Sequence, residues 1–498
     1  MEENEIKTKT FSSVIWKFLE RMGAQIVSFV VAIVLARILD PKDYSVVSIV
    51  TIFFTFANIL ISGGLNSALI QKKDADREDY STILHVSVIL SVIVYIILFF
   101  VAPYIAKLYE QEQLTLMIRV MGLSLPIVAI KSIWCAYISS TLQFKKFFFA
   151  TIGGTIASAV VGLVLAYNGA GAWALIAQQM TNIVIDTIIL IISTRIHILF
   201  TVSITKLKIL FRYGWKVFVS SIIGQVYSQA VPMTIGVKYS GADLAFYTKG
   251  RSFTDLITTM STNTFSAVLF PALAKMQDDK QRLLQGTRLF IRVTSFFMFP
   301  LMLGLFAVAE NFVIVLLTEK WLPAVPYIRI FCIASMFEMI HVGNCETIKA
   351  MGKSGTYLIM EIIKKTGYFL TITAFLFLTK SPEHLAVAFI VCTGIAIVVN
   401  SVPNIKLLGY KLRYQVMDVL PNLLTALVTC ALVFCLNMLT INKLVLLLIQ
   451  VIVGAGAYLG INLLIKNTSL LYLVSFIKKF FHKKHKEDAN EKQAEEIS

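Results

Sequence analysis

Long apolar runs separated by short polar turns recur along the whole chain. A run of about 20 residues with few charges predicts a membrane-spanning helix, because that length crosses the hydrocarbon core. The pattern predicts an all-α polytopic membrane protein with about 14 transmembrane helices. The predicted spans are residues 13–36, 44–70, 81–106, 114–140, 147–167, 171–194, 213–237, 244–274, 287–309, 323–349, 356–379, 384–407, 416–439 and 443–465.

The first span differs from a helix that faces lipid on all sides. Its second half, Met22 to Ala36, is apolar, whereas its first half contains Lys17, Glu20 and Arg21. A charge at the centre of a membrane helix costs roughly 2.5–3.5 kcal/mol on insertion scales, so such residues usually face a protein interior or a watery cavity. The pattern favours a cavity-lining helix. In the alternative interpretation, Glu20 pairs locally with Arg21 while Lys17 reaches the head groups.

Parts of this stretch recur about 200 residues later, in the same order. The matches are Trp16-Lys17 with Trp215-Lys216, Gln25 with Gln225, Asp43 with Asp243, and IRVMGLS from Ile118 with IRIFCIA from Ile328. Their near-constant offset predicts an internal duplication. Two similar halves around a membrane cavity are typical of alternating-access transporters.

Composition and charge exclude a soluble protein and a nucleic-acid binder. Hydrophobic residues make up 57% of the chain, charged residues 15%, and the mean hydropathy is +0.77. With a cytoplasmic N-terminus, the loops on that side hold about 27 Lys and Arg against about 7 opposite, as the positive-inside rule requires. The net charge of +16 therefore indicates membrane topology, with both termini cytoplasmic. The first ten residues, MEENEIKTKT, do not resemble a signal peptide.

Polar residues within other spans are further candidates for a cavity lining. Asn66 follows a small-residue stripe in the second span, and in the seventh Gln225 and Gln229 follow Lys216 at helical spacing. Small residues at such positions also allow close helix packing, and that interpretation stays open.

Three charged positions in later spans have alternative interpretations. Lys249 and Arg251 begin the eighth span, and Lys249 can also reach outer head groups. Asp255 lies four residues after Arg251, so the two can neutralise each other. Asp186 in the sixth span is either a proton or cation site or a satisfied packing group near the helix end.

Two motif-like stretches do not predict a cofactor site. Glu338, His341 and Glu346 resemble metal ligands but have no fourth partner, so no metal is predicted. The sequence GKS at 352–354 resembles the end of a phosphate-binding loop, but Thr347 stands where that motif needs glycine.

Several segments together resemble bacterial polysaccharide-biosynthesis flippases. They are LARILDPKDYS, GGLNSALIQKKDADRED, GAWALIAQQM, VLFPALAKMQDD and TEKWLPAVPYIRIF. These flippases form the Wzx-type, O-antigen group of the superfamily that also contains multidrug and toxic-compound extruders and the lipid II flippase. The resemblance covers about residues 10 to 465.

The resemblance implies two pseudo-symmetric six-helix lobes followed by two further helices. The expected organisation is an N-terminal lobe at 1–194, a basic amphipathic cytoplasmic linker at 195–212, a C-terminal lobe at 213–407, two last spans at 408–465 and a charged tail at 466–498.

The implied function is moving an undecaprenyl-pyrophosphate-linked oligosaccharide to the outer leaflet of the bacterial inner membrane. Lys and Arg form charge-assisted hydrogen bonds with phosphate, whereas hydroxyl-compatible groups suit the sugar. Beyond this cargo and the membrane lipids, a polysaccharide polymerase and glycosyltransferases are the expected partners. The expected residues are Lys17, Arg21, Lys216, Lys249 and Arg251 for pyrophosphate, Gln25, Asn66, Gln225 and Gln229 for the polar lining, and Glu20, Asp186 and Asp255 for coupling to H⁺ or Na⁺.

Two other functions fit the sequence less well. A multidrug antiporter would share the fold, but a cationic drug requires a buried carboxylate, whereas this predicted cavity is basic. A membrane-embedded enzyme is not expected, because the predicted outer loops are too short to carry a catalytic domain.

Overall fold

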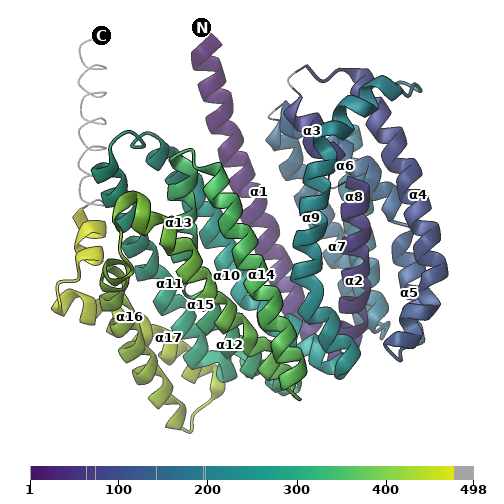
Figure 1. Cartoon of the computed structure of the whole chain (residues 1–498). Coiled ribbons are helices and arrows are strands. Elements are labelled where there is room, and N and C mark those ends of the chain that lie inside the picture. Colours follow the sequence, from purple (N-terminus) through teal and green to yellow (C-terminus); the bar gives the residue numbers. More distant parts are fainter. Residues whose placement is uncertain are drawn as a thin grey trace, which may run out of the picture. The chain divides into compact units, whose positions relative to one another are not determined.

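The computed structural model describes residues 2–62, 64–72, 74–141, 143–194, 196 and 198–475 (Figure 1). Within these ranges, the side chains of 2–15, 17–19, 21, 213, 263, 267, 268, 270–272 and 354 are not described. Ten helical segments in the described part of the chain are long and apolar enough to cross a membrane. The predicted all-α polytopic fold is confirmed, and the described residues form no strand.

The helices follow one another with short connections. They are α1 (Glu2–Ile38), α2 (Pro41–Ser62), α3 (Leu65–Gln71), α4 (Arg77–Leu108), α5 (Gln113–Gly122), α6 (Leu125–Ser140), α7 (Phe144–Tyr167), α8 (Ala172–Ser193), α9 (Ile204–Lys238), α10 (Gly241–Ala274), α11 (Lys280–Leu317), η1 (Glu319–Ala324), α12 (Val325–Ser335), α13 (Glu338–Ala350), α14 (Ser354–Leu378), α15 (Pro382–Leu408), α16 (Leu412–Cys435), η2 (Leu436–Met438) and α17 (Lys443–Leu464).

Three predicted spans are divided in the structure: 44–70 into α2 and α3, 114–140 into α5 and α6, and 323–349 into η1, α12 and α13. Pro126, in the first turn of α6, explains one break, because proline has no backbone N–H for a continuous helix. In addition, α9 begins at Ile204 rather than at 213, because Ser203 caps it by accepting a hydrogen bond from the Lys206 N–H at 3.5 Å. Much of the predicted linker is therefore the first part of α9.

The two halves of the chain share a capping interaction and a divided pair of helices. At the start of α2, the Asp40 N–H donates to Asp43 Oδ2 at 3.1 Å, and at the start of α10 the Ser240 N–H donates to Asp243 Oδ2 at 3.1 Å. The divided pair α5–α6 has its counterpart in α12–α13. This agreement supports the internal duplication predicted from the sequence.

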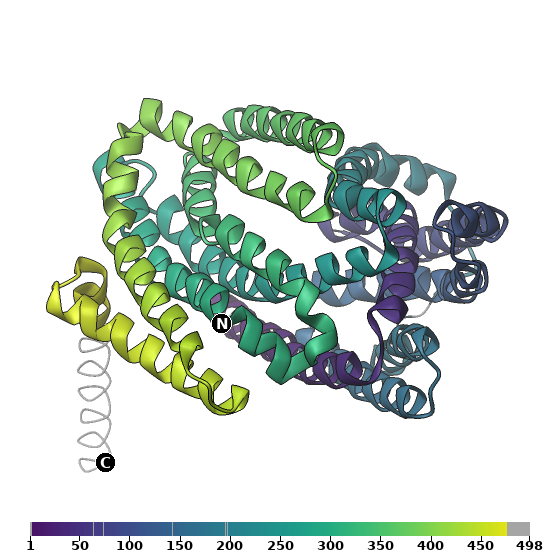
Figure 2. The ribbon, with the colours of Figure 1, turned by 90° about the horizontal axis from the view of Figure 1, so that it is seen from below.

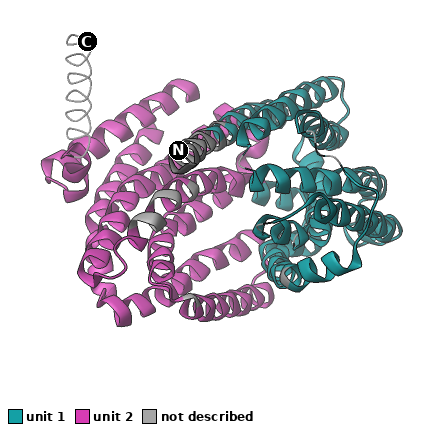
Figure 3. Cartoon of the chain, turned by 90° about the horizontal axis from the view of Figure 1, so that it is seen from above, with its two compact units in different colours: residues 1–248 teal, residues 249–498 magenta. Residues whose placement is uncertain are grey.

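By its contacts the chain forms two compact units, residues 1–248 and 249–498 (Figure 3). The division falls within α10, whereas the predicted lobes meet at the linker 195–212. The predicted lobe boundaries stay a prediction.

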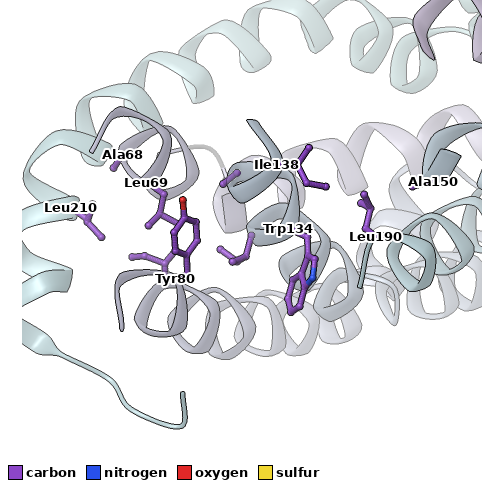
Figure 4. Packing of buried hydrophobic residues seen from close by; sticks show 11 residues of the cluster. Ala68, Leu69, Tyr80, Trp134, Ile138, Ala150, Leu190 and Leu210 are labelled. Carbon is purple, nitrogen blue, oxygen red and sulfur yellow. The ribbon is translucent and has the colours of Figure 1, made fainter. Parts of the chain in front are cut away.

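The core of unit 1 joins six of its helices near the ends of α3 and α4 (Figure 4). Leu69 from α3 packs beside Tyr80 from α4, together with Trp134 and Ile138 from α6. Leu210 from α9 belongs to the same cluster, so the start of α9 is part of this core. Trp134 Nε1 donates to the Thr194 carbonyl at 3.3 Å, which satisfies its buried N–H.

In unit 2, α16 and α17 lie side by side and pack against α11 (Figure 2). Asp418 of α16 accepts hydrogen bonds from Arg288 Nε at 2.8 Å, from Arg292 Nε at 2.8 Å and from the Tyr410 hydroxyl at 2.8 Å. Both arginines belong to α11, so α11 and α16 are joined through a buried carboxylate.

Further polar contacts extend this attachment along α16 and α17. Asn422 Nδ2 donates to the Ser295 hydroxyl at 2.8 Å, and Asn467 Nδ2 donates to Asn422 Oδ1 at 2.9 Å. Near the other end of α11, Asn311 Nδ2 donates to Gln450 Oε1 at 3.0 Å. The start of the predicted charged tail therefore packs into unit 2, while residues 476–498 lie outside the described residues.

Candidate functional site

Charged or polar residues lie within the spans of several long helices, among them α1, α9, α10 and α14. Each ionisable group inside a membrane helix needs a partner or a cavity. The contacts of these groups therefore decide which of them are available to a ligand.

On α10, the predicted residues are held by protein contacts. Arg251 Nε lies 3.2 Å from Asp255 Oδ2, so the pairing considered from their spacing is present. The Arg251 guanidinium also lies 5.1 Å from the ring centre of Phe389. Lys249 is buried, with its ammonium 5.7 Å from the ring centre of Trp321. The Lys249 side chain is therefore covered by other residues of unit 2.

A second ionisable cluster in unit 2 was missed by the sequence reasoning. Lys364 and Glu361 on α14 form an ion pair, and Glu338 on α13 interacts electrostatically with both Lys364 and Asp255. The available signal was the group of charged residues inside the apolar span 356–379, Glu361, Lys364 and Lys365. Glu346, considered above as a metal ligand, instead pairs with Lys349 at 2.8 Å.

Among the described residues of unit 1, amide and hydroxyl groups line three cavities. The first, of about 400 Å³, lies among α2, α3, α6 and α8 and includes Asn58, Asn66 and Lys131. The second, of about 510 Å³, includes Gln178 and Asn182, and the third, of about 310 Å³, includes Gln229. The first two share Phe54 and Ile183, so they are neighbours.

Lys131 is the charged group of the first cavity, and it is paired. Its Nζ lies 2.5 Å from Asp186 Oδ2 on α8, and the Asp186 side chain is 4% exposed. Asp186 is therefore a buried carboxylate held by a lysine, and its role as a proton or cation site stays a prediction. Sequence reasoning missed Lys131, although a lysine within the apolar span 114–140 was a signal.

The remaining predicted residues are less closely grouped. Gln25 and Lys216 are exposed, and neither they nor Gln225 line the three cavities. Glu20 is buried and accepts a hydrogen bond from the Thr151 hydroxyl at 3.4 Å. The side chains of Lys17 and Arg21 lie outside the described residues.

Within unit 1, close contacts occur near both ends of α9: α9 contacts the start of α3 at one end, and α10 contacts α2 near the other. Gly214 lies against Gly64, because a Cβ on Gly214 would be 2.9 Å from the Gly64 carbonyl oxygen. At the opposite end of α9, the Ser48 and Thr248 hydroxyls are 3.3 Å apart.

Comparison with known proteins decides the family. Residues 34–326, more than half of the chain, match the model of the family described as polysaccharide biosynthesis protein. The chain belongs to this family. The resemblance inferred from the sequence is thereby confirmed.

Two relatives and one solved structure agree with this assignment. The chain is 26% identical over 404 residues to an uncharacterized membrane protein in the cps region of Klebsiella pneumoniae. The match covers 78% of this chain and 81% of that protein. The chain is 23% identical over 346 residues to the lipopolysaccharide biosynthesis protein WzxC of Escherichia coli K12, covering 68% and 69%. The fold matches the lipid II flippase MurJ in an inward closed conformation with a TM-score of 0.71, at 15% identity, over 90% of this chain and 97% of that one.

Proposed function

We propose that the protein is a flippase for a lipid-linked oligosaccharide used in surface polysaccharide assembly. It moves an undecaprenyl-pyrophosphate-linked glycan from the cytoplasmic to the outer leaflet of the bacterial inner membrane by alternating access of its two halves. Both termini are cytoplasmic in this proposal. The observation that carries it is membership of the polysaccharide biosynthesis family, together with the fold shared with a lipid II flippase.

The charged helices support a phosphate-bearing cargo. An unpaired buried charge is strongly unfavourable, so a diphosphate leaving water needs cationic partners. Lys216 is exposed on α9, and Arg251 contacts Asp255 with a side chain that is 29% exposed. In the proposed cycle, Arg251 exchanges part of this contact for phosphate oxygens, which arginine binds bidentately.

A proton or sodium gradient resets the proposed cycle, with Glu20, Asp186 and Asp255 as candidate coupling groups. Asp186 and Asp255 each contact a cation of the protein, so protonation of either carboxylate would weaken an ion pair. Transport in vesicles that carry either a proton gradient or a sodium gradient identifies the coupling ion.

The direct test is transfer of a fluorescent lipid-linked glycan between the leaflets of vesicles that contain the purified protein. Arg251→Glu should abolish transfer, while Arg251→Lys retains part of it. Arg282→Glu is the matched control, because Arg282 has a side chain that is 78% exposed at the start of α11. Normal glycan transfer by Arg251→Glu, at equal protein level, would contradict the cavity role. Efflux of cationic drugs without glycan transfer would favour a multidrug antiporter instead.

A further inference from the structure

The first cavity of unit 1 combines an acceptor-rich wall with an ion pair. Asn58 Oδ1, Asn66 Oδ1 and Asp186 Oδ1 are buried and have no hydrogen-bond partner among the described residues. Buried polar atoms are nearly always hydrogen-bonded, so the orphaned acceptors of Asn58 and Asn66 at this cavity point to a ligand with donors. Both asparagines line the cavity, and Asp186 pairs with Lys131, which also lines it.

Lys131 supplies the complementary donors. An ammonium group has three N–H donors, and the contact with Asp186 Oδ2 uses one of them. Lys131 also lines the cavity, where Ser132 and Ser139 add hydroxyl groups. A ligand in this cavity therefore meets both acceptors and donors, which is the pattern that sugar hydroxyls match.

The charge of the cavity argues against the diphosphate as its ligand. Lys131 is the charged residue of the lining, and Asp186 at 2.5 Å neutralises it. Drawing Lys131 away to a phosphate would leave Asp186 as an uncompensated buried charge, which is strongly unfavourable. The described lining of the neighbouring 510 Å³ cavity has no charged residue and includes Gln178, Gln179 and Asn182.

Size and apolar surface agree with a sugar. Both cavities fall within the range of about 300–1,000 Å³ that small-molecule sites occupy. Phe54 lines both of them, and the negative face of its ring attracts the C–H groups of a pyranose.

We propose that these two neighbouring cavities form a subsite for uncharged sugar residues of the cargo, with Asn58, Asn66 and the Lys131–Asp186 pair as its recognition groups. The inference rests on the proposed function and deepens it, because it assigns the sugar to unit 1 and leaves the diphosphate to other cationic residues. Asn66 was expected in a polar lining, and the structure places it in one cavity with Asn58 and the Lys131–Asp186 pair.

Binding measurements with two lipid probes test the subsite. The probes are undecaprenyl diphosphate without sugar and the lipid-linked oligosaccharide extracted from cells that make it, each titrated against the purified full chain in detergent. Asn58→Leu and Asn66→Leu should weaken binding of the glycan lipid at least about tenfold, because the sugar hydroxyls lose their partners. Binding of the sugar-free lipid should change by less than about twofold.

Two further variants keep the test decisive. Asn168→Leu is the matched control, because Asn168 is exposed at the end of α7, away from these cavities, and should bind both lipids normally. The double variant Lys131→Met with Asp186→Leu removes the pair without leaving a charge, and it should reproduce the selective loss even where an asparagine variant misfolds.

Two outcomes overturn the inference in distinguishable ways. If variants that fold normally lose affinity for both lipids equally, or for neither, the sugar subsite is contradicted and the flippase proposal stays intact. Failure of the unmodified protein to bind either lipid contradicts the proposed function itself, and the subsite with it.

Discussion

Gly64 and Gly214 bring α3 and α9 into backbone contact within unit 1. A Cβ on Gly64 would overlap the carbonyl oxygen of Gly214, so neither helix can accept a side chain there without moving. Gly64→Ala should therefore lower the free energy of unfolding by about 1–3 kcal/mol, the usual cost of overpacking.

The control for this variant lies on the same helix. A Cβ on Gly224 in α9 would meet no atom within 4 Å, so Gly224→Ala should stabilise the helix by up to about 1 kcal/mol. Thermal unfolding of the detergent-solubilised protein measures both. Equal stability of the Gly64→Ala variant and the unmodified protein would show that the two helices separate freely.

The Lys131–Asp186 pair should behave as a unit in a double-mutant cycle. Lys131→Met or Asp186→Leu alone leaves a charge inside unit 1 and should cost about 3 kcal/mol. The double variant replaces the pair by apolar groups and should recover most of that loss. Unfolding by denaturant measures the four proteins, and additive effects would contradict the coupling that the 2.5 Å contact implies.

Asp76, at the start of α4, should make a pH-dependent contribution to stability. Its carboxylate accepts hydrogen bonds from Lys206 Nζ at 2.5 Å and from the Asp79 N–H at 2.9 Å, and these contacts lower the pKa of Asp76 from 3.8 to about 2. Because the pKa of Asp76 is lower in the folded protein, its ionised carboxylate stabilises the fold at pH values above the ordinary pKa of 3.8. This contribution is lost as the pH falls from 3.8 to about 2.

Asp76→Asn isolates this charge, because asparagine also caps a helix. The difference in melting temperature between the unmodified protein and this variant should be full above pH 3.8 and vanish towards pH 2. The difference should be small, since the Asp76 side chain is 57% exposed. A difference that grows on acidification would contradict the assigned contacts.

Removal of Asp418 should loosen α16 from α11. Asp418→Asn leaves Arg288 and Arg292 without their shared carboxylate and should cost about 2–3 kcal/mol, less than a fully buried pair because the arginines are 34% and 33% exposed. Limited proteolysis between α15 and α16 should then become faster. Asp279→Asn is a control, since Asp279 caps α11 at an exposed position.

The sequence predicted the helices far better than the site. Apolar run length is a property of each segment alone, so the spans were placed closely. The repeated Asp43 and Asp243 predicted the duplication, which the matching caps of α2 and α10 support. The divisions at α5–α6 and α12–α13 were missed because apolar content continues through them. Pro126 marks the first division, and nothing in the sequence of the second explains its position.

Site residues were harder to predict, because a charge in a span does not reveal its partner. The pairing of Arg251 with Asp255 was foreseen, since both lie on one helix at helical spacing. Lys131 and Asp186 are 55 positions apart on different helices, and their contact arises only through packing of α6 against α8. Attention to every charged residue within an apolar run would have identified Lys131 and Lys364.

The bonds from Asp418 to Arg288 and Arg292 bear on the construction of hybrid proteins. Exchanging the last two helices between relatives would separate this carboxylate from its arginines unless α11 is transferred with them. A fluorophore attached to α17 would likewise report the displacement of α11, because both helices belong to one hydrogen-bonded assembly.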